Sequence, residues 1–213
     1  GLKYKKKYCG SFGDISVLSF YANKHITTGE GGMLLTDDRL INKKIRDYRN
    51  LCFGLKNNRF NHYDIGWNYR YTNIQADLGL NQLKRIKQII KRKYEIGNYY
   101  YQNFKNIKDI IIQPPKLSYC KNIYWVFGIV IKKSSKISAK KITQKLLKKN
   151  IGTRPFFWPI HKQDALKKYS YFKNLKLKNS EFISKNGFYL PSGLGLTLKE
   201  LKFIKNTLIN ILK

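Results

Sequence analysis

The chain of 213 residues is long enough for one ordinary domain or for parts of two. Apolar residues make up 42% of it and aromatic residues 15%, which supports a packed core and excludes wholesale disorder. The formal net charge of +31 is typical of proteins that bind nucleic acids or anionic surfaces, so that class has to be weighed against the motifs.

The first part of the chain predicts short strands separated by polar turns. Residues 3–8 indicate a short basic strand or hairpin arm, residues 15–20 a buried strand and residues 32–36 a second strand. Polar residues at 36–38 offer N-caps for a helix that ends near Arg49.

The middle of the chain predicts a loop followed by a helix. Residues 50–67 lack periodicity and indicate a long loop, a feature that is often functional in compact domains. From residue 72 to about 104 an apolar stripe predicts one long helix, which Gly79 and Gly97 weaken locally.

Two prolines at 114–115 precede a second alternation of strands and helices. The expected order is strand, helix, strand and helix, at residues 124–132, 137–149, 153–157 and 197–212. The last helix begins with a capping box formed by Thr197 and Glu200. Such alternation implies an α/β or α+β layer architecture. We expect a first domain of residues 1–104 and a second of residues 105–213.

One lysine, Lys24, stands in an unusual setting. A strand pattern precedes it, a polar glycine-rich loop at 27–32 follows it, and a second apolar run begins at Met33, which we expect in the core. An amine that is held at a strand end and withdrawn from bulk water is suited to attack an aldehyde in its neutral form. The setting therefore favours carbonyl chemistry at Lys24, whereas composition alone would make it one more surface lysine.

Four motifs, which follow one another along nearly the whole chain, support the hypothesis of carbonyl chemistry at Lys24. They are Ser19–Lys24 followed by Ile26–Gly32, Gly66–Arg70 with Thr72–Ala76, Thr153–His161, and Leu190–Gly193 with Leu196, Thr197 and Glu200. The chain resembles the DegT/DnrJ/EryC1/StrS family of pyridoxal-phosphate-dependent sugar aminotransferases, and within it most closely the GDP-perosamine synthase branch.

The resemblance implies an α/β fold of the aspartate-aminotransferase type, PLP fold type I. The chain would hold part of the large domain, in residues 1–104, and a small C-terminal α+β domain, in residues 105–213. Members of the family also carry an aspartate that pairs with the pyridine nitrogen and a residue that stacks on the ring, and neither can be assigned here. We therefore expect this chain to be the C-terminal portion of an enzyme.

The resemblance also implies roles for three residues at the cofactor. Lys24 would carry pyridoxal 5′-phosphate and move a proton between the amino donor and the cofactor. Ser19 would donate a hydrogen bond to a phosphate oxygen. The alternative interpretation is that Ser19 is an ordinary strand serine without a functional role. Asn68 would reach the phosphate of the neighbouring subunit's cofactor, which implies a homodimer with shared active sites; its alternative is a turn-forming asparagine.

Three further residues are candidates for contact with a nucleotide-sugar. Arg154 and His161 flank an aromatic, proline-braced strand, and a cation beside an imidazole suits a diphosphate and a sugar. The alternative for this pair is a brace at a domain interface. His62, in the long loop, is similar to a family position that lines the sugar site.

The implied reaction transfers an amino group from L-glutamate to the C4 keto group of a nucleotide-linked 4-keto-6-deoxy sugar. Relatives that dehydrate at C3 have histidine in place of the lysine, so Lys24 favours transamination. Amination at C3 remains open as an alternative. So do a basic nucleic-acid-binding module, which would rest on charge alone, and a chain that only packs against a separate N-terminal partner.

Cysteine usage and hydropathy favour a cytoplasmic enzyme without metal. Cys9, Cys52 and Cys120 are widely spaced and odd in number, which indicates neither a zinc site nor a disulfide framework. No apolar run approaches the ~20 residues that cross a bilayer. Because the lysines are spread through every expected element, they predict solvated faces, and we expect neither a nucleic-acid nor a membrane partner.

Overall fold

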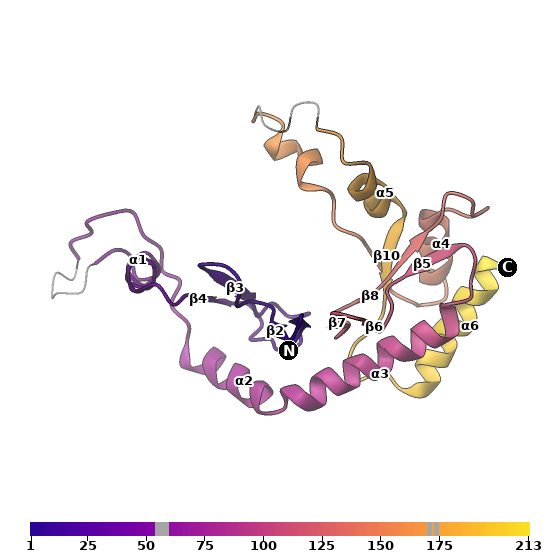
Figure 1. The fold of residues 1–213 in the computed structure, drawn as a ribbon, viewed down its shortest axis with the longest axis horizontal. Coiled ribbons are helices and arrows are strands. Elements are labelled where there is room, and N and C mark those ends of the chain that lie inside the picture. The colour runs from indigo at the N-terminus through magenta and orange to yellow at the C-terminus, as the bar shows by residue number, and fades with distance from the viewer. Residues whose placement is uncertain (54–59, 170–171, 173–174) are drawn as a thin grey trace. The chain divides into compact units, whose positions relative to one another are not determined.

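The computed structural model describes residues 1–53, 60–169, 172 and 175–213, and these form two compact units (Figure 1). The first unit comprises Gly1–Ile90 and Ser118–Cys120, and the second comprises Lys91–Leu117 and Lys121–Lys213. The division between the units falls after Ile90, inside a helix. The expected domain boundary after residue 104 stays a prediction.

A basic hairpin begins the first unit, as predicted. Strands β1 (Lys3–Tyr4) and β2 (Lys7–Tyr8) pair in antiparallel register, with Lys3 opposite Tyr8. The two turn residues between them, at positions 5 and 6, have φ of 46° and 68°. Strand β7 (Cys120–Lys121) adds to this hairpin where Cys120 lies opposite Tyr4.

Strands β3 (Ser16–Ser19) and β4 (Gly32–Leu35) form a second antiparallel pair, which confirms the two strands predicted there. The expected burial is wrong, since Val17 is 74% exposed and Met33 47% exposed. The physical reason is that this sheet has only two strands within the described residues, which leaves most of its apolar side chains, Leu34 and Leu35 included, exposed.

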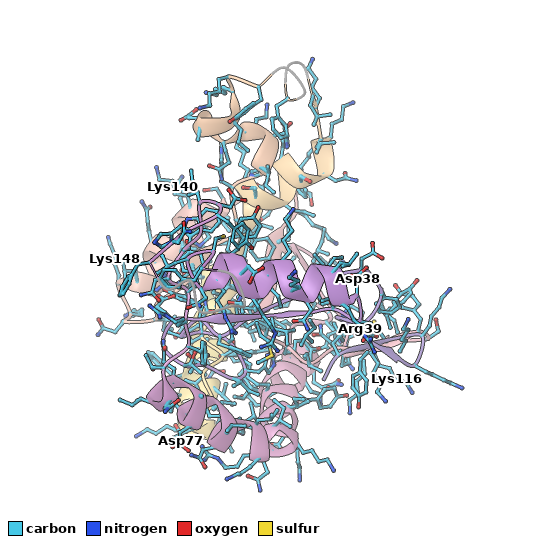
Figure 2. All side chains as sticks on the ribbon, turned by 90° about the vertical axis from the view of Figure 1, so that its left-hand side faces the viewer. Asp38, Arg39, Asp77, Lys116, Lys140 and Lys148 are labelled. Carbon is cyan, nitrogen blue, oxygen red and sulfur yellow. The ribbon has the colours of Figure 1, made fainter. Side chains whose placement is uncertain are left out.

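Helix α1 (Arg39–Arg49) follows β4 and begins where the sequence predicts. Asp38, labelled with Arg39 in Figure 2, is its N-cap. The Asp38 carboxylate accepts hydrogen bonds from the backbone N–H groups of Leu40 at 2.7 Å and Ile41 at 2.9 Å. These bonds satisfy two donors that a helix start otherwise leaves unpaired.

The single long helix expected from residue 72 to 104 is two helices, α2 (Asn73–Lys84) and α3 (Ile86–Phe104). They are separated at Arg85, whose φ of −101° and ψ of 9° leave the helical region. The Arg85 N–H bonds to the carbonyls of Gln82 and Leu83, so α2 ends in a tightened turn. Neither expected weak point, Gly79 or Gly97, interrupts a helix.

The second unit is built on a four-stranded antiparallel sheet in the order β5-β8-β10-β9. Its strands are β5 (Ile110–Ile112), β8 (Phe127–Ile131), β10 (Gly187–Leu190) and β9 (Arg154–Pro155). Strands β8 and β9 lie within segments that the sequence predicts as strands. Strands β5 and β10 have three and four residues and were not predicted.

Helices α4 (Ala139–Leu147), α5 (Lys178–Asn186) and α6 (Leu198–Leu212) complete this unit. The first and last were predicted, including the capping box of α6. Short segments β6 (Lys116–Leu117), η1 (Ile160–Lys162) and η2 (Asp164–Leu166) connect the larger elements.

One apolar core joins the sheet and helices of the second unit. Its fully buried members come from α3, β8, β10, α4 and α6 and from Tyr124, and they include Tyr100, Phe104, Phe127, Phe188 and Leu208. The rings of Tyr100 and Phe127 lie 5.1 Å apart between centroids. Burial of large aromatic side chains of this kind is a main source of the unit's stability.

Lysines project from many elements. Lys116 of β6, and Lys140 and Lys148 at the two ends of α4, are exposed (Figure 2). Their placement agrees with solvated faces, and the expected lack of a nucleic-acid partner stays a prediction. Within the described residues, no helix is long and apolar enough to cross a membrane. The same residues contain no group of three or more metal-ligating side chains.

Candidate active site

Lys24 lies on a closed loop, which we call the lysine loop and define as Phe20–Gly31, between β3 and β4. The Phe20 N–H donates to the Gly31 carbonyl at 2.9 Å, and the Phe20 carbonyl accepts from the Thr28 N–H at 3.0 Å. Within the loop, the Lys24 N–H donates to the Tyr21 carbonyl at 3.0 Å. The half-buried lysine is thus carried by a turn beyond the strand rather than by the strand end that was expected.

The glycines near the end of the loop allow a tyrosine to approach. Thr28 is 5% exposed, donates its hydroxyl to the Glu30 carbonyl at 2.7 Å and shares a hydrogen bond with the Tyr71 hydroxyl. Gly31 has a φ of 136°, and a Cβ added there would lie 2.6 Å from the Tyr71 ring. A larger residue at position 31 would be strained in its backbone and would displace this ring.

Helix α2 holds the lysine loop through two glutamines. The Gln82 side chain accepts from the Thr27 N–H at 3.1 Å and donates to the Thr27 carbonyl at 2.6 Å. Gln75 donates to the Glu30 carbonyl at 3.2 Å. Sequence reasoning missed both roles because Gln82 is 55 residues from Thr27 and nothing local marks the contact.

Ser19 is the last residue of β3, where it lies opposite Gly32 and is exposed. Its Oγ accepts a 3.4 Å hydrogen bond from the Tyr21 N–H. A hydroxyl carries one hydrogen and two acceptor lone pairs, so this contact leaves the hydrogen able to donate to an anion. The structure therefore brings Ser19 to the base of the loop that carries Lys24.

Asn68 lies on a different segment of the first unit, beside the C-terminal end of α1. It forms an isolated antiparallel bridge with Asn50. The Arg70 guanidinium donates to the Asn68 side-chain oxygen at 2.8 Å. Because that contact uses the oxygen, the exposed amide NH₂ group keeps its capacity to donate.

His62 lies in the same part of the unit. Its Nδ1 is 2.6 Å from the Leu51 carbonyl, and its ring centroid is 4.6 Å from that of Phe53. A carbonyl oxygen only accepts, so Nδ1 carries the hydrogen in this contact. The loop predicted at 50–67 includes residues 54–59, which lie outside the described residues.

Two tyrosine–aspartate pairs fasten this segment to α1. The Tyr63 hydroxyl donates to the buried carboxylate of Asp47 at 2.7 Å, and the Tyr48 hydroxyl donates to Asp64 at 2.9 Å. The bond to Asp47 raises the pKa of Tyr63 to about 12. The backbone N–H of Ile65, and then the Tyr48 hydroxyl, hold the pKa of Asp64 below its usual range.

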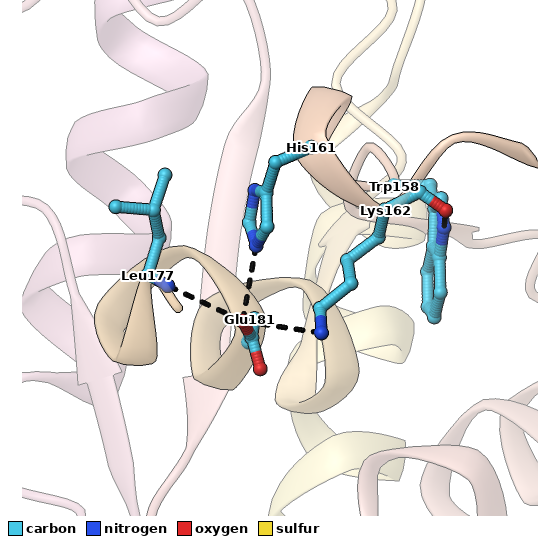
Figure 3. Close-up of polar contacts among 5 residues, drawn as sticks. All are labelled: Trp158, His161, Lys162, Leu177 and Glu181. Atoms are coloured by element: carbon cyan, nitrogen blue, oxygen red, sulfur yellow. Dashed lines mark hydrogen bonds and ion pairs between the residues drawn. The ribbon is translucent and has the colours of Figure 1, made fainter. Parts of the chain in front are cut away.

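The remaining candidates belong to the second unit. Arg154 is exposed on β9, opposite Tyr189 of β10. His161 is buried, with its Nε2 at 3.0 Å from the Glu181 carboxylate (Figure 3). Lys162 lies 3.5 Å from the same carboxylate oxygen, and the hydrogen bond from His161 is the main cause that lowers the pKa of Glu181. This contact gives His161 a bracing role within the second unit, not at the domain interface that the alternative named.

A buried lysine that sequence reasoning missed lies on α3. Lys93 is 8% exposed, and its ammonium donates to the carbonyls of Trp125 at 2.7 Å and Ser192 at 2.8 Å. Burial lowers the pKa of Lys93 to about 8. Its contacts tie α3 to the loop after β10, which identifies it as a structural residue.

Comparison with known proteins bears on this arrangement. The model of the DegT/DnrJ/EryC1/StrS aminotransferase family matches residues 1–209. GDP-perosamine synthase from Escherichia coli O157:H7 is 34% identical over 204 residues, which cover 96% of this chain and 53% of that protein. The chain spans about half the length of the curated relatives it matches.

Two solved structures show the same fold. The Helicobacter pylori aminotransferase PseC, involved in the biosynthesis of pseudoaminic acid, has a TM-score of 0.89 at 27% identity and covers 99% of this chain and 56% of its own. Escherichia coli GDP-4-keto-6-deoxy-D-mannose-3-dehydratase, with bound hydrated PLP, has a TM-score of 0.80 at 23% identity and covers 98% of this chain and 57% of its own.

These matches confirm the predicted α/β fold of the PLP-dependent sugar aminotransferases. The family model extends from the basic hairpin of the first unit into α6 of the second, and it includes all four motifs found in the sequence. The chain therefore belongs to the DegT/DnrJ/EryC1/StrS aminotransferase family.

Proposed function

We propose that this chain supplies the lysine and phosphate-binding groups of a PLP-dependent sugar aminotransferase. The reaction would move an amino group from L-glutamate to the C4 keto group of a nucleotide-linked 4-keto-6-deoxy sugar, with GDP-4-keto-6-deoxymannose as the first substrate to test. The observation that carries the proposal is Lys24, half-buried on a closed loop within a family match that covers nearly the whole chain.

The side chains present fit the cofactor by their chemistry. An aldehyde requires a primary amine, and Lys24 provides one. A phosphate group requires neutral or cationic donors, and both the Ser19 hydroxyl and the Asn68 amide keep donor capacity on exposed side chains. Pyridoxal phosphate, when bound, would supply an aldehyde and an electron-withdrawing ring.

Each residue then has a distinct role. Lys24 would accept a proton from the Cα of the amino donor and deliver it to the cofactor carbon, so it would act first as general base and then as general acid. Ser19 orients the phosphate beside the loop. His62, Arg154 and His161 remain candidates for the nucleotide-sugar, and the contact with Glu181 makes His161 the weakest of them.

The active site would be shared between two copies of the chain in a homodimer. Lys24 and Ser19 belong to one loop region, whereas Asn68 lies on a separate exposed segment beside α1. We assign Asn68 to the phosphate site of the other protomer. A two-fold dimer is the commonest oligomer and would create two identical composite sites.

The proposed reaction can be followed directly. The protein encoded by the whole gene is incubated with pyridoxal phosphate, L-[¹⁵N]glutamate and GDP-4-keto-6-deoxymannose, and the sugar formed in the reaction is analysed by NMR. We expect ¹⁵N on the sugar C4. Lys24→Arg should form no product, because arginine keeps the positive charge but has no primary amine. Label at C3 would refute the assigned position, and failure to aminate any nucleotide-linked keto sugar would refute the function.

A further inference from the structure

The main chain of Thr27 is held on both sides by one side chain. Gln82 accepts from the Thr27 N–H at 3.1 Å and donates to the Thr27 carbonyl at 2.6 Å. The second hydrogen of the same amide group reaches the Leu78 carbonyl of α2 at 3.0 Å. Both hydrogens and the oxygen of the carboxamide are therefore engaged, which sets the orientation of the Gln82 side chain.

Thr27 is also the residue at which the lysine loop closes. Its hydroxyl donates to the Phe20 carbonyl at 3.0 Å and accepts from the Gly29 N–H at 3.0 Å. The next residue, Thr28, donates its N–H to that same Phe20 carbonyl at 3.0 Å. Lys24 lies between these two ends, so the position of Thr27 limits where the lysine can be placed.

We propose that Gln82 is a positioning residue for Lys24, because its carboxamide holds the Thr27 main chain against α2 as a neighbouring strand would. The proposal rests on the proposed function for its catalytic consequence, though not for the clamp itself. Few side chains can replace it. A methionine of similar length has no donor, and an ionised glutamate would place a negative oxygen against the Thr27 carbonyl.

Gln75 and Tyr71 act on a different part of the loop, at Glu30 and Thr28. They fasten the end that returns to β4 and leave the Thr27 backbone to Gln82. Loss of Gln82 should therefore loosen the segment that contains Lys24 while the end of the loop stays in place. Loosening that is confined to the Lys24 segment would indicate a positioning role for Gln82, whereas loosening of the whole loop would indicate a general loss of structure.

Amide hydrogen exchange measured by NMR on the 213-residue chain tests the clamp without cofactor. In Gln82→Met we expect exchange at the Thr27 and Lys24 amides to accelerate by about tenfold. Asn81→Ala is the matched control, because Asn81 is exposed on the same helix and its side chain bonds, among the described residues, only to the Asp77 carbonyl of that helix. Exchange in Gln82→Met that equals the wild type, or that rises equally across α2, would overturn the proposal.

Gln82→Glu provides a rescue that a structural role would not show. At neutral pH its carboxylate can accept from Thr27 but cannot donate, whereas the protonated acid does both. Protection of the Thr27 amide, relative to the wild type at the same pH, should rise as the pH falls toward the ordinary carboxyl pKa of about 4.3. A flat profile would contradict the clamp.

Labelling links the clamp to the lysine. The product of the whole gene, as wild type, Gln82→Met and Asn81→Ala, is treated with pyridoxal phosphate and borohydride, and the modified peptides are quantified by mass spectrometry. The share of label on Lys24 should fall at least severalfold in Gln82→Met and stay unchanged in Asn81→Ala. An unchanged share despite faster exchange would refute positioning. A wild type without preference for Lys24 would refute the proposed function, and the exchange at Lys24 would still decide the role of Gln82.

Discussion

Replacing Gly97 by alanine reverses the usual effect of that change in a helix. Alanine in a helix interior is favoured over glycine by about 1 kcal/mol. At Gly97, however, the added Cβ would lie 2.2 Å from the ring of Tyr124, far inside van der Waals contact. The ring is 1% exposed and its hydroxyl reaches the Gln113 carbonyl, so it has little room to move. Overpacking of this kind costs about 1–3 kcal/mol, and after the helix gain of about 1 kcal/mol is subtracted we expect a net destabilisation of up to about 2 kcal/mol.

The assay is urea unfolding of the chain, followed in the second unit, and it is repeated in a Tyr124→Leu background. The smaller side chain removes the overlap, so Gly97→Ala should there be neutral or stabilising by up to about 1 kcal/mol. The difference between the two backgrounds measures the coupling between these neighbours. Equal effects in both backgrounds, or a stabilised single variant, would refute the packing argument.

Three more predictions concern the rest of the chain. Tyr63→Phe removes the hydrogen bond to buried Asp47, so amide exchange at residue 63 should accelerate, and an unchanged rate would contradict this fastening. Because Lys93 has a pKa near 8 when folded and the ordinary 10.5 when unfolded, the unfolded state binds more protons between these values. The stability of the wild type relative to Lys93→Met should therefore rise from pH 8 to pH 10.5, and a constant difference would refute the assignment. In mixed dimers of Lys24→Ala with Asn68→Ala, one of the two shared sites is intact, so activity should recover toward about half of the wild-type value. If activity does not recover although the subunits have exchanged, shared sites are ruled out.

Elements with a local signal were predictable from the sequence. The capping box at Thr197 and the N-cap at Asp38 act within one helical turn, so the residues that form them are adjacent in the chain. Strands β3 and β4 were predicted from their apolar residues. Their expected burial was wrong, because burial depends on what packs against a sheet, and within the described residues most apolar side chains of this pair stay exposed.

Features that depend on contacts between distant residues were not predictable. The interruption at Arg85 has no glycine or proline to mark it, and the clamp of Gln82 on Thr27 joins residues 55 positions apart. The assignment of Lys24 and Ser19 as site residues comes from one motif that contains both, and it stays a prediction. The partner of His161 could not be predicted, since Glu181 is 20 residues away and contacts it only after the second unit has folded.

The most direct test of the account is chemical identification of the lysine that carries the cofactor. The product of the whole gene is loaded with pyridoxal phosphate, reduced with borohydride and digested, and the modified residue is read from the peptide masses. The account predicts stoichiometric label on Lys24, abolished by prior incubation with L-glutamate, which releases the lysine. Label on another lysine, or label spread evenly over surface lysines, would contradict it.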